Sequence, residues 1–144
     1  MKLTAGGRSY SQSLTVKMDP RVKTPAADLA QQFAVSKQLY DDVVGAGKAL
    51  AEIRAARRKQ PGTDFEKKAL AIEGEPGPGR FGGRGGAAAT DSLASVSGAL
   101  TALMNEIQAA DVAPTAAEAG AVADRRAALR RLLDRWSALK AEVR

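Results

Sequence analysis

The chain has 144 residues, a net charge of +6, and neither cysteine nor histidine. These absences exclude disulfides, thiol- and histidine-based catalytic centres, and every metal site built on cysteine or histidine ligands. Thirty alanines and only 34 large apolar residues indicate one domain with a thin core. Such a composition favours closely packed helices, because alanine has the highest helix propensity.

Residues 1–23 predict a β-hairpin. A glycine pair at 6–7 supplies a turn between a first strand at 2–4 and a second strand over 9–18. The second strand shows the alternating pattern of a sheet, with apolar residues at Leu14, Val16 and Met18. Asp19-Pro20 ends it. Because a lone hairpin is marginally stable in water, we expect its open edges to pair with another surface.

Residues 25–60 predict a long helix, with Thr24 as N-cap, Pro25 in the first turn and Pro61-Gly62 as the stop. Its last turns are basic, which suits a helix C-terminus. Heptad rows assign a wide core face to this helix: Leu29, Ser36, Val43 and Leu50; Phe33, Tyr40 and Gly47; Leu39, Ala46 and Ile53. We therefore place the aromatic pair Phe33 and Tyr40 in the core, with assistance to a metal site by the Tyr40 hydroxyl as the alternative.

A short helix is expected from Thr63 or Asp64 to Ile72. Residues 74–89 follow as a flexible Gly/Pro-rich linker. The stretch 79–86 within it is superficially similar to RNA-binding Arg-Gly segments and to phosphate-binding loops. It lacks the Gly-Lys-Ser/Thr ending of such a loop, so we interpret it as part of the linker.

Two further helices complete the pattern. One covers 91–110, capped by Thr90 or Asp91, and the other runs from Thr115 to the C-terminus. Thr115 and Glu118 have the spacing of a capping box. The last helix carries a coiled-coil-like seam of Val122, Leu129, Leu132, Trp136, Leu139 and Val143. The sequence thus predicts an all-α antiparallel helical bundle over 24–144, interrupted at 74–89, with a short N-terminal β-hairpin over 1–23.

The phrase at residues 14–22 (LTVKMDPRV) and the helix at 28–41 (DLAQQFAVSKQLYD) resemble the C-terminal region of bacterial BNR/sortilin-type β-propeller proteins. In that family, which is associated with glycoside hydrolysis or sugar binding, the phrase ends the last strand of an immunoglobulin-like domain and a helical tail follows. The resemblance implies a detached tail without its propeller, so no sugar-related activity or catalytic residue is carried over. It also implies that longer relatives are secreted or periplasmic.

The leading functional prediction is a helical packing module that associates with a second copy. Loss of neighbouring domains would leave helix faces and strand edges uncovered, and a symmetric dimer is the commonest way to cover them. The sequence as written shows no signal-peptide pattern and no apolar run that spans a bilayer. A cytoplasmic location without membrane association is therefore expected.

The alternative is a small metal-dependent hydrolase of activated phosphotriesters or other esters. Without histidine, carboxylates from several helices or from two chains would have to hold zinc or a harder divalent ion. The candidate ligands are Asp41, Asp42, Glu106 and Glu118. A bound ion would generate hydroxide and polarise the ester. The competing interpretation of Glu118 is its place in the capping box.

A third hypothesis is weak binding of polyanions through the basic last helix. Its seven cations are interleaved with four carboxylates, as on a solvated face: Arg125, Arg126, Arg130, Arg131, Arg135, Lys140 and Arg144 against Glu118, Asp124, Asp134 and Glu142. Nucleic-acid binding prefers a denser patch with aromatic residues for stacking, and nucleic acid is therefore not the expected partner.

Overall fold

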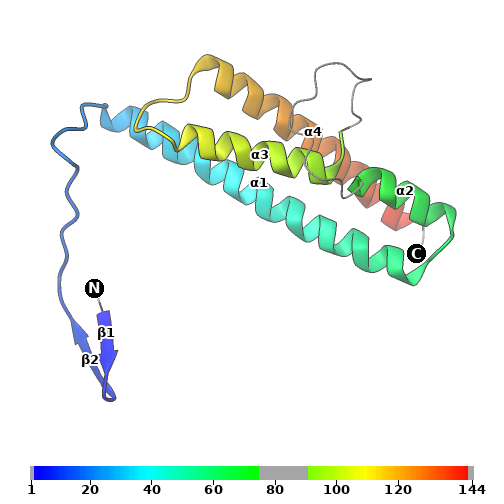
Figure 1. Ribbon diagram of the computed structural model, residues 1–144, viewed down its shortest axis with the longest axis horizontal. Helices are drawn as coiled ribbons and strands as arrows, with labels where there is room; N and C mark the ends of the chain where they lie inside the picture. Colours follow the sequence, from blue (N-terminus) through cyan, green and yellow to red (C-terminus); the bar gives the residue numbers. More distant parts are fainter. Residues whose placement is uncertain (1, 75–90, 143–144) are drawn as a thin grey trace.

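The computed structural model describes residues 2–74 and 91–142, and it confirms the helical bundle with an N-terminal hairpin (Figure 1). The elements are β1 (Lys2–Ala5), β2 (Arg8–Ser11), α1 (Ala26–Lys59), α2 (Asp64–Glu73), α3 (Leu93–Ile107) and α4 (Ala116–Ala141). Apart from Gly74, the predicted linker at 74–89 lies outside the described residues. So do the stretch 79–86, Val143 and Arg144.

α2 and α3 follow one another in the same direction, antiparallel to both α1 and α4 (Figure 1). α1 and α4 contact each other, and both also contact α2 and α3. The fold is therefore a three-helix bundle in which α2 and α3 together take the place of one helix.

The hairpin lies away from the bundle (Figure 1). Its strands are antiparallel, with Leu3 opposite Tyr10, and Gly6 and Gly7 make the turn at positive φ as predicted. The second strand ends at Ser11, so its predicted extension to residue 18 is wrong. Among the described residues no further strand pairs with this segment, and alternation alone forms no strand without a hydrogen-bonding neighbour. Every side chain from residue 3 to residue 18 is exposed.

The first turn of α1 is fixed to the connection between α3 and α4. The N-cap is Pro25 and not Thr24, and no side chain caps this helix. The Thr24 hydroxyl instead donates to the backbone oxygen of Asp111. The Gln32 amide donates to the carbonyl oxygens of Ile107 (2.6 Å) and Ala110 (2.5 Å). Thr24 and Gln32 therefore donate hydrogen bonds to backbone carbonyl oxygens at and just after the end of α3, where the helix itself supplies no partner.

The other three helices begin at side-chain caps. Thr63 accepts a hydrogen bond from the backbone of Glu66 and starts α2, as predicted. The predicted capping box of Thr115 and Glu118 is confirmed at the start of α4. α3 is capped by Ser92, which forms a capping box with Ser95, so the prediction of Thr90 or Asp91 is wrong. The serine motif offers a hydroxyl at both positions and satisfies two backbone donors.

One apolar core joins the four helices. Its most deeply buried side chains are Leu39, Ile53, Leu93, Val96 and Leu100. α4 contributes the predicted seam, which is buried at Val122, Leu129, Leu132, Trp136 and Leu139. Buried alanines on α1, α2 and α4 let the helices approach closely: Ala46, Ala49, Ala69 and Ala128.

Gly74 closes α2 where that helix meets the start of α3. Its φ of 86° and ψ of 150° belong to a region that only glycine adopts readily. A Cβ built on Gly74 would lie 2.6 Å from the Cβ of Ser92, the cap of α3. The residue is therefore required both by its backbone conformation and by the close approach of the two helices.

Gly74→Ala should lower the free energy of unfolding by about 1–3 kcal/mol from backbone strain alone, and more if Ser92 loses its capping geometry. Gly98→Ala is the matched control, since Gly98 lies inside α3 with nothing within 4 Å of an added Cβ. That change should stabilise the protein by about 0.5–1 kcal/mol. Urea denaturation of both variants measures the contrast, and equal effects would contradict the role given to Gly74.

Candidate interaction surface

α1 carries a second apolar row on the side that faces away from the bundle. The exposed fractions are 71% for Phe33, 54% for Tyr40 and 39% for Val44. The placement of Phe33 and Tyr40 in the core was therefore wrong. The other predicted core positions Ser36, Leu39, Ala46 and Ile53 are confirmed as buried, and Ala49 is buried with them. Both rows recur every seven residues, and the smaller side chains face inward because the helices pack closely.

The outward row has the spacing of a coiled-coil seam. We call it the α1 stripe, and it alternates in steps of three and four residues: Ala30, Phe33, Lys37, Tyr40, Val44, Gly47 and Ala51. Lys37 forms an ion pair with Asp41 at its edge, with 2.5 Å between Nζ and Oδ2. Gly47 has no side chain, and nothing lies within 4 Å of a Cβ built on it, so the stripe has a gap that is open to solvent at this position. Large apolar side chains and such a gap on one exposed helix face form a surface suited to another helix.

A shallow groove lies near the other end of the molecule, between the end of α1, the start of α2 and the last turns of α4. We call it the Trp136 groove. It has a volume of about 400 Å³ and a mostly apolar lining: Glu52, Ala55, Ala56, Lys59, Gln60, Phe65, Trp136 and Lys140. The rings of Phe65 and Trp136 are 6.3 Å apart, and the Lys140 ammonium lies 5.3 Å from the Trp136 ring centre. The groove thus has an aromatic floor and a charged rim.

Glu52 orders the rim of this groove. Its Oε2 accepts hydrogen bonds from Lys140 Nζ (3.1 Å) and from Trp136 Nε1 (3.3 Å). The hydrogen bond and charge of Lys140, together with the indole donor, hold the pKa of Glu52 below its ordinary value. These contacts fix the orientation of the indole ring, so the groove is formed before anything occupies it.

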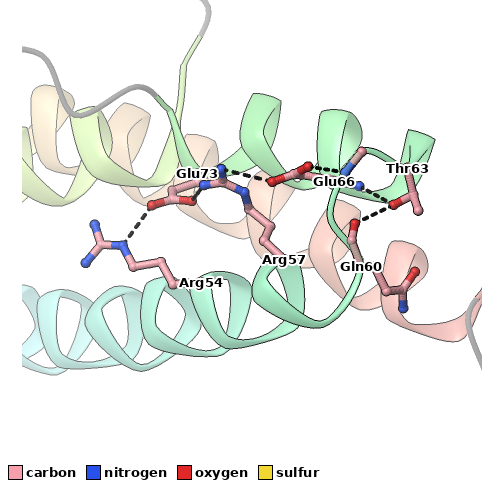
Figure 2. Close-up of polar contacts among 7 residues, drawn as sticks. Arg54, Arg57, Gln60, Thr63, Glu66 and Glu73 are labelled. Carbon is pink, nitrogen blue, oxygen red and sulfur yellow. Dashed lines mark hydrogen bonds and ion pairs between the residues drawn. The ribbon is translucent and has the colours of Figure 1, made fainter.

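The corner between α1 and α2 holds a cluster of charged side chains, which Figure 2 shows with Glu73 between Arg54 and Arg57. Arg54 Nε donates to Glu73 Oε1 at 2.7 Å, and Arg57 Nη1 donates to Oε2 at 2.5 Å. Arg57 also lies 3.6 Å from Glu66. The Glu73 side chain is only 4% exposed, so its charge is compensated within the protein.

Opposing effects act on the pKa of Glu73. Burial raises its pKa, but hydrogen bonds from Arg54 and Arg57 and their positive charges outweigh burial and leave the pKa below its ordinary value. The sequence predicted basic residues at the end of α1 and missed their partner. Glu73 ends α2 at 19 residues from Arg54 and 16 residues from Arg57, so the sequence carries no local signal of this buried ion pair. The adjoining cavity of about 470 Å³ is lined by both arginines and both glutamates of this cluster.

The four candidate metal ligands do not converge in the described part of the chain. Asp41 pairs with Lys37, and Asp42 Oδ2 accepts from Arg126 Nε at 2.5 Å. Glu118 accepts from the backbone and hydroxyl of Thr115, and these two bonds lower its pKa. Glu106 is exposed near the end of α3. Across residues 2–74 and 91–142, no three or more carboxylates are grouped to hold an ion. The zinc-dependent hydrolase and its ester substrate stay predictions.

The basic side chains of α4 are partly engaged with carboxylates of other elements. Arg125 and Arg131 approach Asp91, and Arg126 pairs with Asp42. This arrangement supports a solvated, mixed-charge face, and polyanion binding stays an untested prediction. No helix in the described ranges is long and apolar enough to cross a membrane.

Comparison with protein-family models, with curated proteins and with solved structures found no match to this chain. The resemblance to the C-terminal region of propeller proteins therefore stays a prediction from the sequence.

Proposed function

We propose that this protein is a self-associating packing module in which the α1 stripes of two copies pair in a symmetric dimer. The observation that carries this proposal is the exposed Phe33–Tyr40–Val44 row at coiled-coil spacing. Each of the three side chains is an exposed large apolar residue on a rigid helix. Covering them removes apolar surface from water at about 25 cal/mol per Å².

The pattern of the stripe is self-complementary. Phe33 lies seven residues before Tyr40, and Gly47 lies seven residues after it. When two α1 helices run antiparallel about a two-fold axis at Tyr40, Phe33 of each copy meets the partner's Gly47, where no side chain stands in its way. A two-fold interface uses the same patch on both subunits, so each match occurs twice. The absence of a Cβ at Gly47 allows the close approach that a phenyl ring needs.

The charges beside the stripe are compatible with this pairing. Lys37 and Asp41 lie on either side of Tyr40 and already form an ion pair within one chain. Around the two-fold axis, the pairs of both copies meet with opposite signs adjacent to each other. The Lys37 and Asp41 side chains are 54% and 57% exposed in the single chain, so at the edge of the paired helices they can keep part of their contact with water.

Native mass measurement with a charge substitution tests the dimer. The wild-type protein should have twice the 15.0 kDa mass of one chain. Tyr40→Glu should raise the dimer dissociation constant at least about a hundredfold, since the introduced carboxylates of the two copies would meet at the two-fold axis. Ala102→Glu is the control, because it adds the same group to an exposed position on α3.

Circular dichroism must show that both variants keep the helical content of the wild type. A wild-type protein that stays monomeric at high micromolar concentration would refute the proposal. So would a Tyr40→Glu variant that dimerises as tightly as Ala102→Glu.

A further inference from the structure

Two apolar features of the molecule lie uncovered at opposite ends of α1. Near its N-terminus lie residues 12–23, which we call the arm; its first part is extended and a turn follows at 19–22 (Figure 1). Its apolar residues Leu14, Val16 and Met18 are 71%, 86% and 62% exposed. They are spaced by two residues, so in an extended chain they project to one side. Near the C-terminal end of α1 lies the Trp136 groove.

We propose that the arm of one copy occupies the Trp136 groove of the other copy. The inference rests on the antiparallel dimer proposed above and adds a second contact to it. Leu14, Val16 and Met18 would lie against the floor of Ala55, Ala56, Phe65 and Trp136. An extended segment commonly binds in this way, with alternate side chains in a groove and its backbone at the rim.

The reach of the arm excludes its own groove. From Ala26 to Ala55, α1 rises about 44 Å at 1.5 Å per residue. The arm leaves α1 at Ala26 and turns at 19–22, where Val22 N donates to the Asp19 carbonyl oxygen at 3.0 Å. Such a turn spans less than about 7 Å. Even when the other residues are fully extended, Val16 reaches only about 32 Å from Ala26. The arm therefore falls about 12 Å short of the centre of its own groove.

The antiparallel dimer brings the arm to the partner's groove. Ala26 is fourteen residues before Tyr40, and Arg54 is fourteen residues after it. With the axis at Tyr40, Ala26 of one copy lies beside the partner's Arg54, at an interhelix distance of about 8–10 Å. The arm thus starts next to the groove that it cannot reach within its own chain. Ala55 is one turn beyond Ala51, so the groove also begins where the α1 stripe ends.

The chemistry of the groove fits this occupant. Three apolar side chains match its apolar floor, and the rim of Glu52, Lys59, Gln60 and Lys140 can meet the polar backbone of the arm. The volume of about 400 Å³ lies in the range of ordinary binding pockets. An arm docked in this way would also place the isolated hairpin next to the partner's bundle.

Disulfide trapping tests the contact directly, because the natural chain has no cysteine. Val16→Cys and Ala55→Cys chains are mixed at equal concentration, one of them labelled with ¹⁵N, and oxidised with oxidised glutathione. Mass spectrometry should find the mixed covalent dimer in at least fivefold excess over that formed by Val16→Cys with Ala102→Cys. Equal yields from the two mixtures would overturn the proposal.

Trypsin cleavage at Lys17 supplies a second readout, since this residue lies in the arm and is exposed in the single chain. Ala55→Asp in the groove should raise the rate of cleavage at Lys17 at least about twofold and leave the protein dimeric. Ala102→Asp, at an exposed position on α3, should leave that rate unchanged. A dimer that forms without trapping or protection of Lys17 refutes only the arm contact. A wild-type monomer refutes both the arm contact and the proposed function.

Discussion

Glu73→Ala is expected to lower the free energy of unfolding by about 3 kcal/mol at pH 7. Removing one member of a buried ion pair leaves its partner charged and poorly solvated, which typically costs about 3–5 kcal/mol. Glu73 is buried and holds two arginines, of which Arg57 is 24% exposed and Arg54 is 54% exposed. Arg54 can turn into water, so the lower end of that range applies. Urea denaturation followed by circular dichroism measures the loss.

Glu73 also makes the free energy of unfolding depend on pH. Because the pKa of Glu73 is lower in the folded protein, its contribution is fully present above the unfolded value, near 4.5. It is lost as the pH falls through the lower folded pKa. Wild type and Glu73→Gln should therefore differ most near neutral pH and converge in strong acid.

Glu106→Gln removes an exposed carboxylate and should change stability by no more than about 0.5 kcal/mol at any of these pH values. A constant difference between wild type and Glu73→Gln from pH 7 to pH 2 would show that the Glu73 charge does not stabilise this corner.

The elements that the sequence predicted well are those with local signals. Thr63, Thr115 and Glu118 are caps whose partners lie three residues away, so their spacing alone identifies them. The seam of α4 was equally clear, because one set of large side chains repeats on an otherwise charged helix. Such patterns depend only on the geometry of a single α-helix, which is the same in every protein.

The faces of α1 were harder to assign, because this helix has two apolar rows. The prediction placed the row of Leu39 and Ile53 and the row of Phe33 and Tyr40 together on one wide core face. The structure buries only the first row and leaves the aromatic row exposed. Which row faces inward depends on α3 and α4, and the period of α1 alone does not contain that information.

The candidate sites depended even more on tertiary structure. Asp42 was a possible metal ligand by residue type, yet Arg126, 84 residues away, holds its carboxylate. Glu73 attracted no prediction, although it is the most buried charged side chain among the described residues. Neither partnership has a fixed sequence spacing. Both follow from the way α1 packs against the other helices.

Leu100→Ala should destabilise the bundle by about 3–4 kcal/mol, whereas Phe33→Ala should change the stability of a single chain by no more than about 0.5 kcal/mol. Leu100 is fully buried, so its truncation removes apolar contacts. It also leaves a cavity between helices whose packed backbones cannot move together enough to fill it. Phe33 is 71% exposed within one chain, so its truncation leaves the core intact. The two changes therefore separate folding of the chain from association of two chains.

Thermal unfolding at several protein concentrations distinguishes the two effects. The midpoint of a folded dimer rises with concentration, because association stabilises only the native state. Leu100→Ala should lower the midpoint at every concentration and keep its concentration dependence. Phe33→Ala should unfold at the same midpoint as the wild type when the protein is dilute, and its midpoint should rise much less with protein concentration. If Phe33→Ala instead lowers the midpoint of the dilute protein as much as Leu100→Ala does, Phe33 belongs to the core of the single chain, and the α1 stripe is not a free surface.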